Sequence, residues 1–275
     1  MKQECGVCMH GCALEPGQRG RCGARINKEG RIISENYGRI TALALDPIEK
    51  KPLRMFHPGS MILSVGSYGC NLSCPFCQNH EIAHPGEPCG VISTSPQELV
   101  NKALDLKSAG NIGLAFTYNE PLIGYEFVRD TAQAARAAGL KTVAVTNGSV
   151  TEEIAASLLP DLDALNIDLK GFTKAYYERL GGDLETVKRF IKSAVEHKCH
   201  VELTTLIVPG QNDSEDEMKR LSGWVASVDP NMPLHVTRFF PNWKMRDLEP
   251  TPVERVYALA ETARKSLAHV FTGNC

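Results

Sequence analysis

Short apolar runs alternate with amphipathic stretches along most of the chain, from about residue 61 onward. The apolar runs are partly β-branched and have the length of strands. They cover residues 61–65, 112–118, 141–147, 164–170, 200–208, 234–240 and 269–272. Repeated strand–helix units of this kind predict an α/β fold with a parallel sheet. The pattern alone does not choose between a barrel and a doubly wound sheet.

Helix boundary signals lie between these predicted strands. Ser95, Ser214 and Thr251 are each followed three residues later by Glu, which is the pattern of a capping box at a helix start. The stretch 183–198 places its apolar residues on one face at helical spacing. A further helix is predicted over residues 121–138, before a glycine that can end it.

Residues 1–58 differ from the rest because they are rich in Cys, Gly and Arg and show little helical period. A hairpin is predicted over residues 25–33, with its turn at Lys28-Glu29-Gly30. We therefore predict two parts, a Cys-rich, metal-binding N-terminal segment (1–58) and a core domain (59–275).

Composition limits the function classes. The 275 residues are 43% hydrophobic and 23% charged, with a formal net charge of −2. Such a chain gives no electrostatic reason to expect nucleic acid or a membrane surface as a partner. No apolar run approaches the ~20 residues of a membrane span, and the start has no signal-peptide pattern. We expect a cytoplasmic protein whose ten cysteines are metal ligands or reactive thiols rather than disulfides.

Cys70, Cys74 and Cys77 carry the most specific signal, in the spacing C-x3-C-x2-C directly after the first predicted strand of the core domain. Three thiolates can hold three irons of a [4Fe-4S] cluster and leave the fourth iron open for chemistry. Half of a zinc site is the alternative. The next cysteine is Cys89, and no further CxxC pair follows at zinc-ribbon distance.

This cysteine run resembles the signature of the radical S-adenosylmethionine (SAM) superfamily. The resemblance implies a partial (β/α)6 barrel, TIM-like, with a [4Fe-4S] cluster on Cys70, Cys74 and Cys77. It implies that the open iron chelates SAM and that one electron then splits SAM to a 5′-deoxyadenosyl radical. It also implies that Phe76 lies near the adenine. An external one-electron reductant of the flavodoxin or ferredoxin type is the expected partner.

Polar residues at the ends of the predicted strands are the candidates for holding SAM. Asn119-Glu120-Pro121 resembles the Gly-Gly-Glu-Pro segment of the pyruvate formate-lyase activating branch, which implies a contact with the SAM amino group. A carboxylate that stabilises a helix start is the alternative for Glu120. Asn147 begins an Asn-Gly dipeptide that predicts a turn and that the resemblance places at the SAM pocket.

Asp168 and Lys170 alternate with apolar residues, so both point to one side of their strand. Unpaired buried charges are costly, so this pair is either a structural ion pair or functional. Its Asp-Leu-Lys sequence is similar to that of glycyl-radical-enzyme activating enzymes, which implies a place beside the SAM methionine moiety. His235 is a further pocket candidate, although a lone histidine in a strand is more often a core residue.

A second ligand-rich cluster precedes the core domain: Cys5-x2-Cys8-x3-Cys12-x9-Cys22. Four thiolates can close a zinc site or hold a second iron–sulfur cluster, and their spacing does not decide between the two. With this segment included, nearly the whole chain resembles the radical SAM proteins of the AmmeMemoRadiSam gene set, which are related to pyruvate formate-lyase activating enzyme.

The predicted function is that of a radical SAM enzyme that abstracts hydrogen from a substrate, and a candidate substrate is a glycyl radical enzyme. Another peptide or a small molecule is the alternative within enzymes. A non-catalytic zinc or iron–sulfur binding module is the alternative of a different class. Cys89, Cys199 and Cys275 have no partners at ligand spacing, so their roles stay open.

Overall fold

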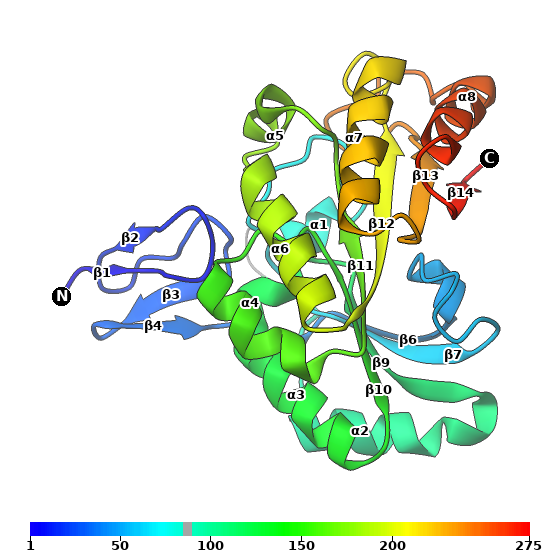
Figure 1. Cartoon of the computed structure of the whole chain (residues 1–275). Coiled ribbons are helices and arrows are strands. Elements are labelled where there is room, and N and C mark those ends of the chain that lie inside the picture. The colour runs from blue at the N-terminus through cyan, green and yellow to red at the C-terminus, as the bar shows by residue number, and fades with distance from the viewer. Residues whose placement is uncertain (85–89) are drawn as a thin grey trace.

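A central eight-stranded sheet organises the computed structural model, which describes residues 1–84 and 90–275 (Figure 1). The strand order is β14-β13-β12-β11-β10-β9-β7-β6. The strands are β6 (Ala42–Pro47), β7 (Met61–Gly66), β9 (Asn111–Thr117), β10 (Lys141–Thr146), β11 (Ala164–Asp168), β12 (His200–Ile207), β13 (Leu234–Arg238) and β14 (Val270–Gly273). Neighbours from β7 to β14 are parallel, which confirms the predicted strands and the α/β fold.

The sheet is open, because β6 and β14 are its two edges within the described residues. This arrangement agrees with a partial rather than a closed barrel. Only β6 runs against its neighbour β7, from Ala42 opposite Gly66 to Pro47 opposite Met61. Residues 42–47, which the sequence assigned to the N-terminal segment, thus extend the main sheet. The predicted boundary near residue 58 stays a prediction.

Helices follow most of the parallel strands and flank the sheet (Figure 1). They are α1 (His80–Ala83), α2 (Pro96–Asp105), α3 (Tyr125–Ala137), α4 (Glu152–Leu158), α5 (Lys174–Arg179), α6 (Leu184–Glu196), α7 (Glu215–Val228) and α8 (Val253–Arg264). Short 3-10 helices are η1 (Ile48–Lys50), η2 (Lys107–Ala109), η3 (Pro121–Gly124) and η4 (Leu159–Asp161). The main apolar core lies between these helices and the strands. No helix of the described residues is long and apolar enough to cross a bilayer.

The three predicted capping boxes have different outcomes. At α2, Ser95 and Glu98 make both bonds of the box. At α7, the Ser214 hydroxyl accepts a hydrogen bond from the amide of Glu217. The Glu217 carboxylate is used elsewhere, because it accepts a 2.6 Å hydrogen bond from the amide of Phe172.

The capping box predicted at Thr251 is wrong. Helix α8 begins at Val253, its N-cap is Pro252, and no side chain caps it. The Thr251 hydroxyl instead donates a 2.6 Å hydrogen bond to the carbonyl of Ile207. A tertiary contact with the end of β12 has therefore taken the hydroxyl that the local pattern assigned to the helix.

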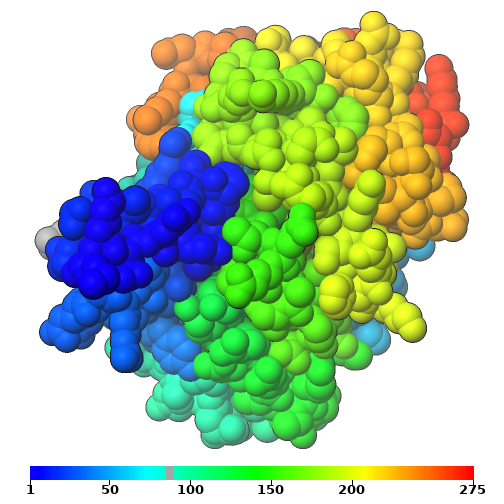
Figure 2. All heavy atoms as spheres, turned by 60° about the vertical axis from the view of Figure 1, so that its left-hand side comes forward, coloured from blue at the N-terminus to red at the C-terminus, as the bar shows by residue number. Residues whose placement is uncertain are grey.

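The N-terminal region packs beside the core domain (Figure 2) and takes part, within the described residues, in three short antiparallel pairs outside the main sheet, the last of which joins it to a strand of the core domain. They are formed by β1 (Gln3–Glu4) with β2 (Ala13–Leu14), β3 (Arg25–Lys28) with β4 (Arg31–Ser34), and β5 (Arg39–Ile40) with β8 (Ile92–Ser93). The predicted hairpin is confirmed as β3 and β4. Its turn has positive φ at Glu29 (54°) and Gly30 (88°), as tight hairpin turns require.

Residues 48–57 cross from the β6 edge to the inner face of the sheet. The amides of Arg54 and Met55 donate hydrogen bonds of 2.9 and 2.7 Å to the carboxylate of Glu202 on β12. The side chain of Asn166 on β11 donates to the carbonyl of Pro52 at 2.9 Å. This segment therefore supplies further hydrogen-bond partners to buried polar side chains of β11 and β12.

Candidate active site

A cavity of about 610 Å³ lies among the carboxyl ends of the parallel strands. This size is in the range of small-molecule sites, and active sites of parallel α/β folds lie at this end of the strands. Every candidate that the sequence assigned to the core domain lines it: Cys70, Cys74, Phe76, Cys77, Asn119, Glu120, Asn147, Asp168, Lys170 and His235. Their location is thereby established, while their individual roles stay predictions.

The loop after β7 carries the three cysteines of the core motif, and all three thiols are free. Gly69 begins this loop with φ of +92°, a conformation that side chains rarely adopt. A Cβ there would lie 2.6 Å from the carbonyl oxygen of Cys22. The amide of Cys70 donates to that same carbonyl at 3.1 Å. Only glycine lets the loop approach the N-terminal region so closely.

The donor set fits a [4Fe-4S] cluster. Burial raises the pKa of Cys74 to about 11, although the Lys170 ammonium acts to lower it, and burial also raises the pKa of Cys70. Both thiols are therefore neutral unless a metal binds them. In the part of the chain that the structure describes, no three His, Cys, Asp or Glu side chains close around a point as ligands of a single ion do. A cluster binds each thiolate to a different iron and so accepts a wider separation of its ligands.

The buried carboxylate of Glu120 is hydrogen-bonded to the end of β10 and the loop after it. Its Oε1 accepts hydrogen bonds from the amide of Leu122 (3.0 Å) and the hydroxyl of Thr146 (2.6 Å), and its Oε2 accepts one from the amide of Asn147 (2.7 Å). Burial raises the pKa of Glu120 to about 7, although these hydrogen bonds act to lower it. The predicted alternative, a carboxylate at a helix start, is confirmed at η3. Glu120 lines the cavity as well.

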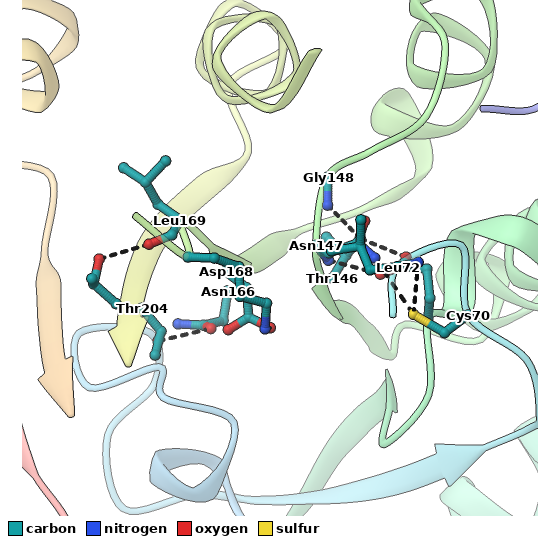
Figure 3. Close-up of polar contacts among 12 residues, drawn as sticks. Cys70, Leu72, Thr146, Asn147, Gly148, Asn166, Asp168, Leu169 and Thr204 are labelled. Atoms are coloured by element: carbon teal, nitrogen blue, oxygen red, sulfur yellow. Dashed lines mark hydrogen bonds and ion pairs between the residues drawn. The ribbon is translucent and has the colours of Figure 1, made fainter. Parts of the chain in front are cut away.

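Asn147 joins the end of β10 to the cysteine loop (Figure 3). Its Nδ2 donates to Oδ1 of Asn71 at 2.9 Å and lies 3.8 Å from Sγ of Cys70. The side chain of Asn71 is fully buried and donates in turn to the carbonyl of Ser149 at 2.8 Å. An amide N–H pointing at the sulfur of Cys70 is suited to orient that sulfur and to stabilise negative charge on it.

Asn119 ties the end of β9 to the same loop. Its Oδ1 accepts a hydrogen bond from the amide of Ser67 at 2.9 Å, and its Nδ2 donates to the carbonyl of Gly69 at 3.1 Å. The amide side chain therefore fixes the start of the cysteine loop and leaves little of its own hydrogen-bonding capacity for a ligand.

Asp168 and Lys170 lie on one side of the chain at the end of β11, as the alternation predicts, and form an ion pair of 2.7 Å. Burial alone would lower the pKa of Lys170, but the charges of Asp168 and Cys74 raise it well above its usual value. Lys170 acts in return to lower the pKa of Cys74. Lys170 therefore stays positively charged at neutral pH and lines the same cavity as the three thiols.

His235 is a buried histidine with a hydrogen-bond partner, as the alternative interpretation of a satisfied core residue expects, and it also lines the cavity. Its Nε2 lies 2.6 Å from the carboxylate of Glu202, which is fully buried and also bonds Nε2 of His200 at 2.9 Å. Burial acts to raise the pKa of Glu202, but the two imidazoles and the amides of Arg54 and Met55 lower it to about 2. Glu202 was missed in the sequence, although a single acidic residue within an apolar strand was the available signal.

Tyr118 was missed as well, and it follows β9 with a strained φ of +74°. It lines the cavity, and its hydroxyl donates to Asp46 at 2.9 Å. Asp46 also forms a buried ion pair with Lys51 at 2.9 Å. No local sequence pattern predicts this network, because β6 and the segment after it are distant from β9 in the sequence and meet it only in the folded structure.

The N-terminal thiols gather beside the core motif. Cys5, Cys8 and Cys22 are buried, Cys12 is half-buried, and all four are free. Burial is the largest cause that raises the pKa of Cys8 to about 11, and the nearby Cys22 and Cys5 act in the same direction. The ring of His10 bonds the carbonyl of Asn71 at 2.8 Å, which places this region against the cysteine loop.

The remaining cysteines have different surroundings. Cys199 is buried, and its thiol donates to the carbonyl of Leu159 at 3.4 Å, so it packs as a core residue. Cys275 is exposed. Cys89 lies outside the described residues.

Comparison with known proteins adds a family match. The model of the Radical SAM superfamily matches residues 64–221. The chain is 36% identical to the uncharacterized protein MJ0808 of Methanocaldococcus jannaschii over 99% of this chain and 81% of that one. It is 27% identical to the pyruvate formate-lyase 1-activating enzyme of Escherichia coli K12, over 56% of this chain and 63% of that enzyme.

Among solved structures, the fold is similar to that of a radical SAM methyltransferase from Sphaerobacter thermophilus. The TM-score is 0.59 at 16% identity, and the match covers 79% of this chain and 67% of that one. Likeness at such low identity concerns the fold alone.

Proposed function

The chain belongs to the radical SAM superfamily, and from this membership we propose that it binds a [4Fe-4S] cluster through Cys70, Cys74 and Cys77 with SAM beside it. One observation carries the proposal: the three thiols and the Asp168–Lys170 pair line one cavity at the carboxyl ends of the strands. This is the place where parallel α/β folds bind their ligands.

Bound together, a cluster and SAM supply a 5′-deoxyadenosyl radical that abstracts hydrogen from a substrate. The residues of the chain bind and orient these groups. The Lys170 ammonium is suited to a carboxylate such as that of SAM, and Asp168 is suited to an amino group. Phe76 gives the same cavity an apolar wall. Glu120 and Asn147 hold the loops around the site, and His235 faces it from β13.

We propose a protein substrate, with activation of a glycyl radical enzyme as the first candidate. The similarity to the Escherichia coli activating enzyme supports this choice. The chain spans 63% of that enzyme's length, so its substrate is an inference by resemblance. The electron donor is proposed to be a flavodoxin or a ferredoxin. Another peptide or a small molecule would use the same cavity.

For the N-terminal region we propose a second soft-metal site on Cys5, Cys8, Cys12 and Cys22, holding zinc or iron–sulfur. Three of these free thiols are buried, and the electrostatic coupling among the four supports the proposal. In the described residues no three of them already surround one point as the ligands of a single zinc ion do. Metal analysis of the anaerobically purified chain and of a Cys8→Ser variant tests it. Loss of zinc or of part of the iron with this change supports the site, and unchanged contents refute it.

Formation of 5′-deoxyadenosine tests the proposed activity directly. Protein reconstituted anaerobically with iron and sulfide is given SAM and dithionite, and the product is measured by chromatography. We expect product from the wild type and from Cys199→Ala, whose thiol packs in the core, but none from Cys74→Ala. A loaded wild type without product, or product from Cys74→Ala at the wild-type rate, would contradict the proposal. If the wild type carries a full cluster but forms no product, the alternative of a non-catalytic binding module is favoured.

A further inference from the structure

Tyr176 lies on α5 with 2% of its surface exposed. Its hydroxyl oxygen is buried and has no hydrogen-bond partner in the part of the chain that the structure describes. A buried hydroxyl without a partner is unfavourable, and each such group in a folded protein needs an explanation. The phenol is held firmly, because its ring lies against Gly171, where a Cβ would come within 2.5 Å of the ring carbon Cδ1.

The surroundings of the phenol point to the cysteine loop. Tyr176 belongs to one apolar cluster with Cys74 and Phe76, and the half-buried Cys70 packs against that cluster. Burial raises the pKa of the phenol, and the charged group that raises it most thereafter is the Cys74 thiolate. The unpartnered hydroxyl therefore lies near the sulfur of a proposed cluster ligand.

We propose that the Tyr176 hydroxyl would donate a hydrogen bond to one sulfur atom of a cluster held by Cys74 and would thereby raise the reduction potential of that cluster. This inference rests on the proposed function, because it presupposes the cluster. A cluster held by Cys74 would supply the sulfur acceptor that the described residues do not offer to this hydroxyl. Hydrogen bonds to the sulfurs stabilise the reduced, more negative state and so make reduction easier. Tyr176 would thus be a positioning residue that touches no substrate.

Tyr177, the next residue, provides a matched control. It is fully buried as well, but its hydroxyl accepts a 3.1 Å hydrogen bond from the amide of Lys170. The chain itself therefore satisfies the hydroxyl of Tyr177, whereas that of Tyr176 has no such partner. Replacing either residue with phenylalanine removes one hydroxyl and leaves the ring in place.

The experiment compares reconstituted wild type, Tyr176→Phe and Tyr177→Phe at equal iron and sulfide content. The midpoint potential of the cluster is measured by redox titration monitored by electron paramagnetic resonance. Exchangeable protons near the reduced cluster are counted by electron–nuclear double resonance after transfer to D₂O. Urea unfolding of the cluster-free proteins is the third measurement.

For Tyr176→Phe we expect a more negative potential and the loss of one strongly coupled exchangeable proton. The urea midpoint of the cluster-free variant should be no lower than that of the wild type, because the hydroxyl that is removed has no partner there. For Tyr177→Phe we expect a lower urea midpoint and an unchanged proton signal, because the bond to the Lys170 amide is lost. If the cluster of the Tyr176→Phe variant has the wild-type potential and proton couplings, the proposed hydrogen bond is refuted, while the proposed function is not affected. A lower urea midpoint for cluster-free Tyr176→Phe would also overturn the proposed hydrogen bond, because the hydroxyl would then have a partner within the chain. A wild type that binds no cluster would overturn the proposed function, and this inference with it.

Discussion

Glu202→Gln should destabilise the fold by about 3 kcal/mol at pH 7. The carboxylate is fully buried and accepts hydrogen bonds from the imidazoles of His200 and His235 and from the amides of Arg54 and Met55. These partners lower its pKa from 4.5 to about 2. At about 1.4 kcal/mol for each pKa unit, the difference corresponds to roughly 3 kcal/mol of stability. Glutamine keeps one acceptor oxygen but presents N–H groups to the other donors, so little of this stability is kept in the variant.

The effect should depend on pH in a defined direction. Because the folded pKa of Glu202 is lowered, its contribution is complete above the unfolded value of 4.5 and is lost as the pH falls toward about 2. At pH 3 about 2 kcal/mol of it should be gone, so the gap between the wild type and Glu202→Gln narrows to roughly 1 kcal/mol.

Urea unfolding of both proteins at pH 7, 4 and 3 measures this gap. Glu185→Gln is the matched control, because Glu185 is a carboxylate of α6 that is 60% exposed and forms an ion pair with Lys188. It should change the stability by less than about 0.5 kcal/mol at each pH. A Glu202→Gln gap below about 1 kcal/mol at pH 7, or one that is constant between pH 7 and pH 3, would refute the reasoning.

Further predictions concern the cysteine loop and the ion pair. Gly69→Ala should abolish iron binding in reconstitution assays, because its Cβ would lie 2.6 Å from the carbonyl oxygen of Cys22. Gly17→Ala, which has a similar φ of +81° but nothing within 4 Å of the added Cβ, should lose only about 1 kcal/mol of stability and bind iron normally; equal iron contents in the two variants would contradict this. Lys170→Met should reduce SAM binding and 5′-deoxyadenosine formation by at least ~100-fold while the iron content is kept, because the cation facing the thiols is removed. The exposed Lys174→Met should leave both unchanged, and wild-type SAM affinity in Lys170→Met would show that the pair is structural.

The strands, most helix starts and the cysteine motif were predictable because each depends on residues close together in the chain. The apolar period and the Ser95 capping box are local signals, and so is the C-x3-C-x2-C spacing. The rule that parallel strands end at one edge then placed Asp168, Lys170 and Glu120 in one cavity with the thiols. Thr251 shows the limit of local reasoning, since its hydroxyl bonds Ile207 rather than the helix after it.

The sequence by itself determined the α/β class, the positions of the main strands along the chain and the types of ligand at the site, because periodicity and spacing are properties of short stretches. Tertiary structure alone decided that β6 joins the sheet as an antiparallel edge and that Asn147 meets Cys70. It alone brought Glu202 to His235, 33 residues away, and to Arg54, 148 residues away. A buried carboxylate needs donors, but which donors reach it is decided only when the whole chain has folded around it.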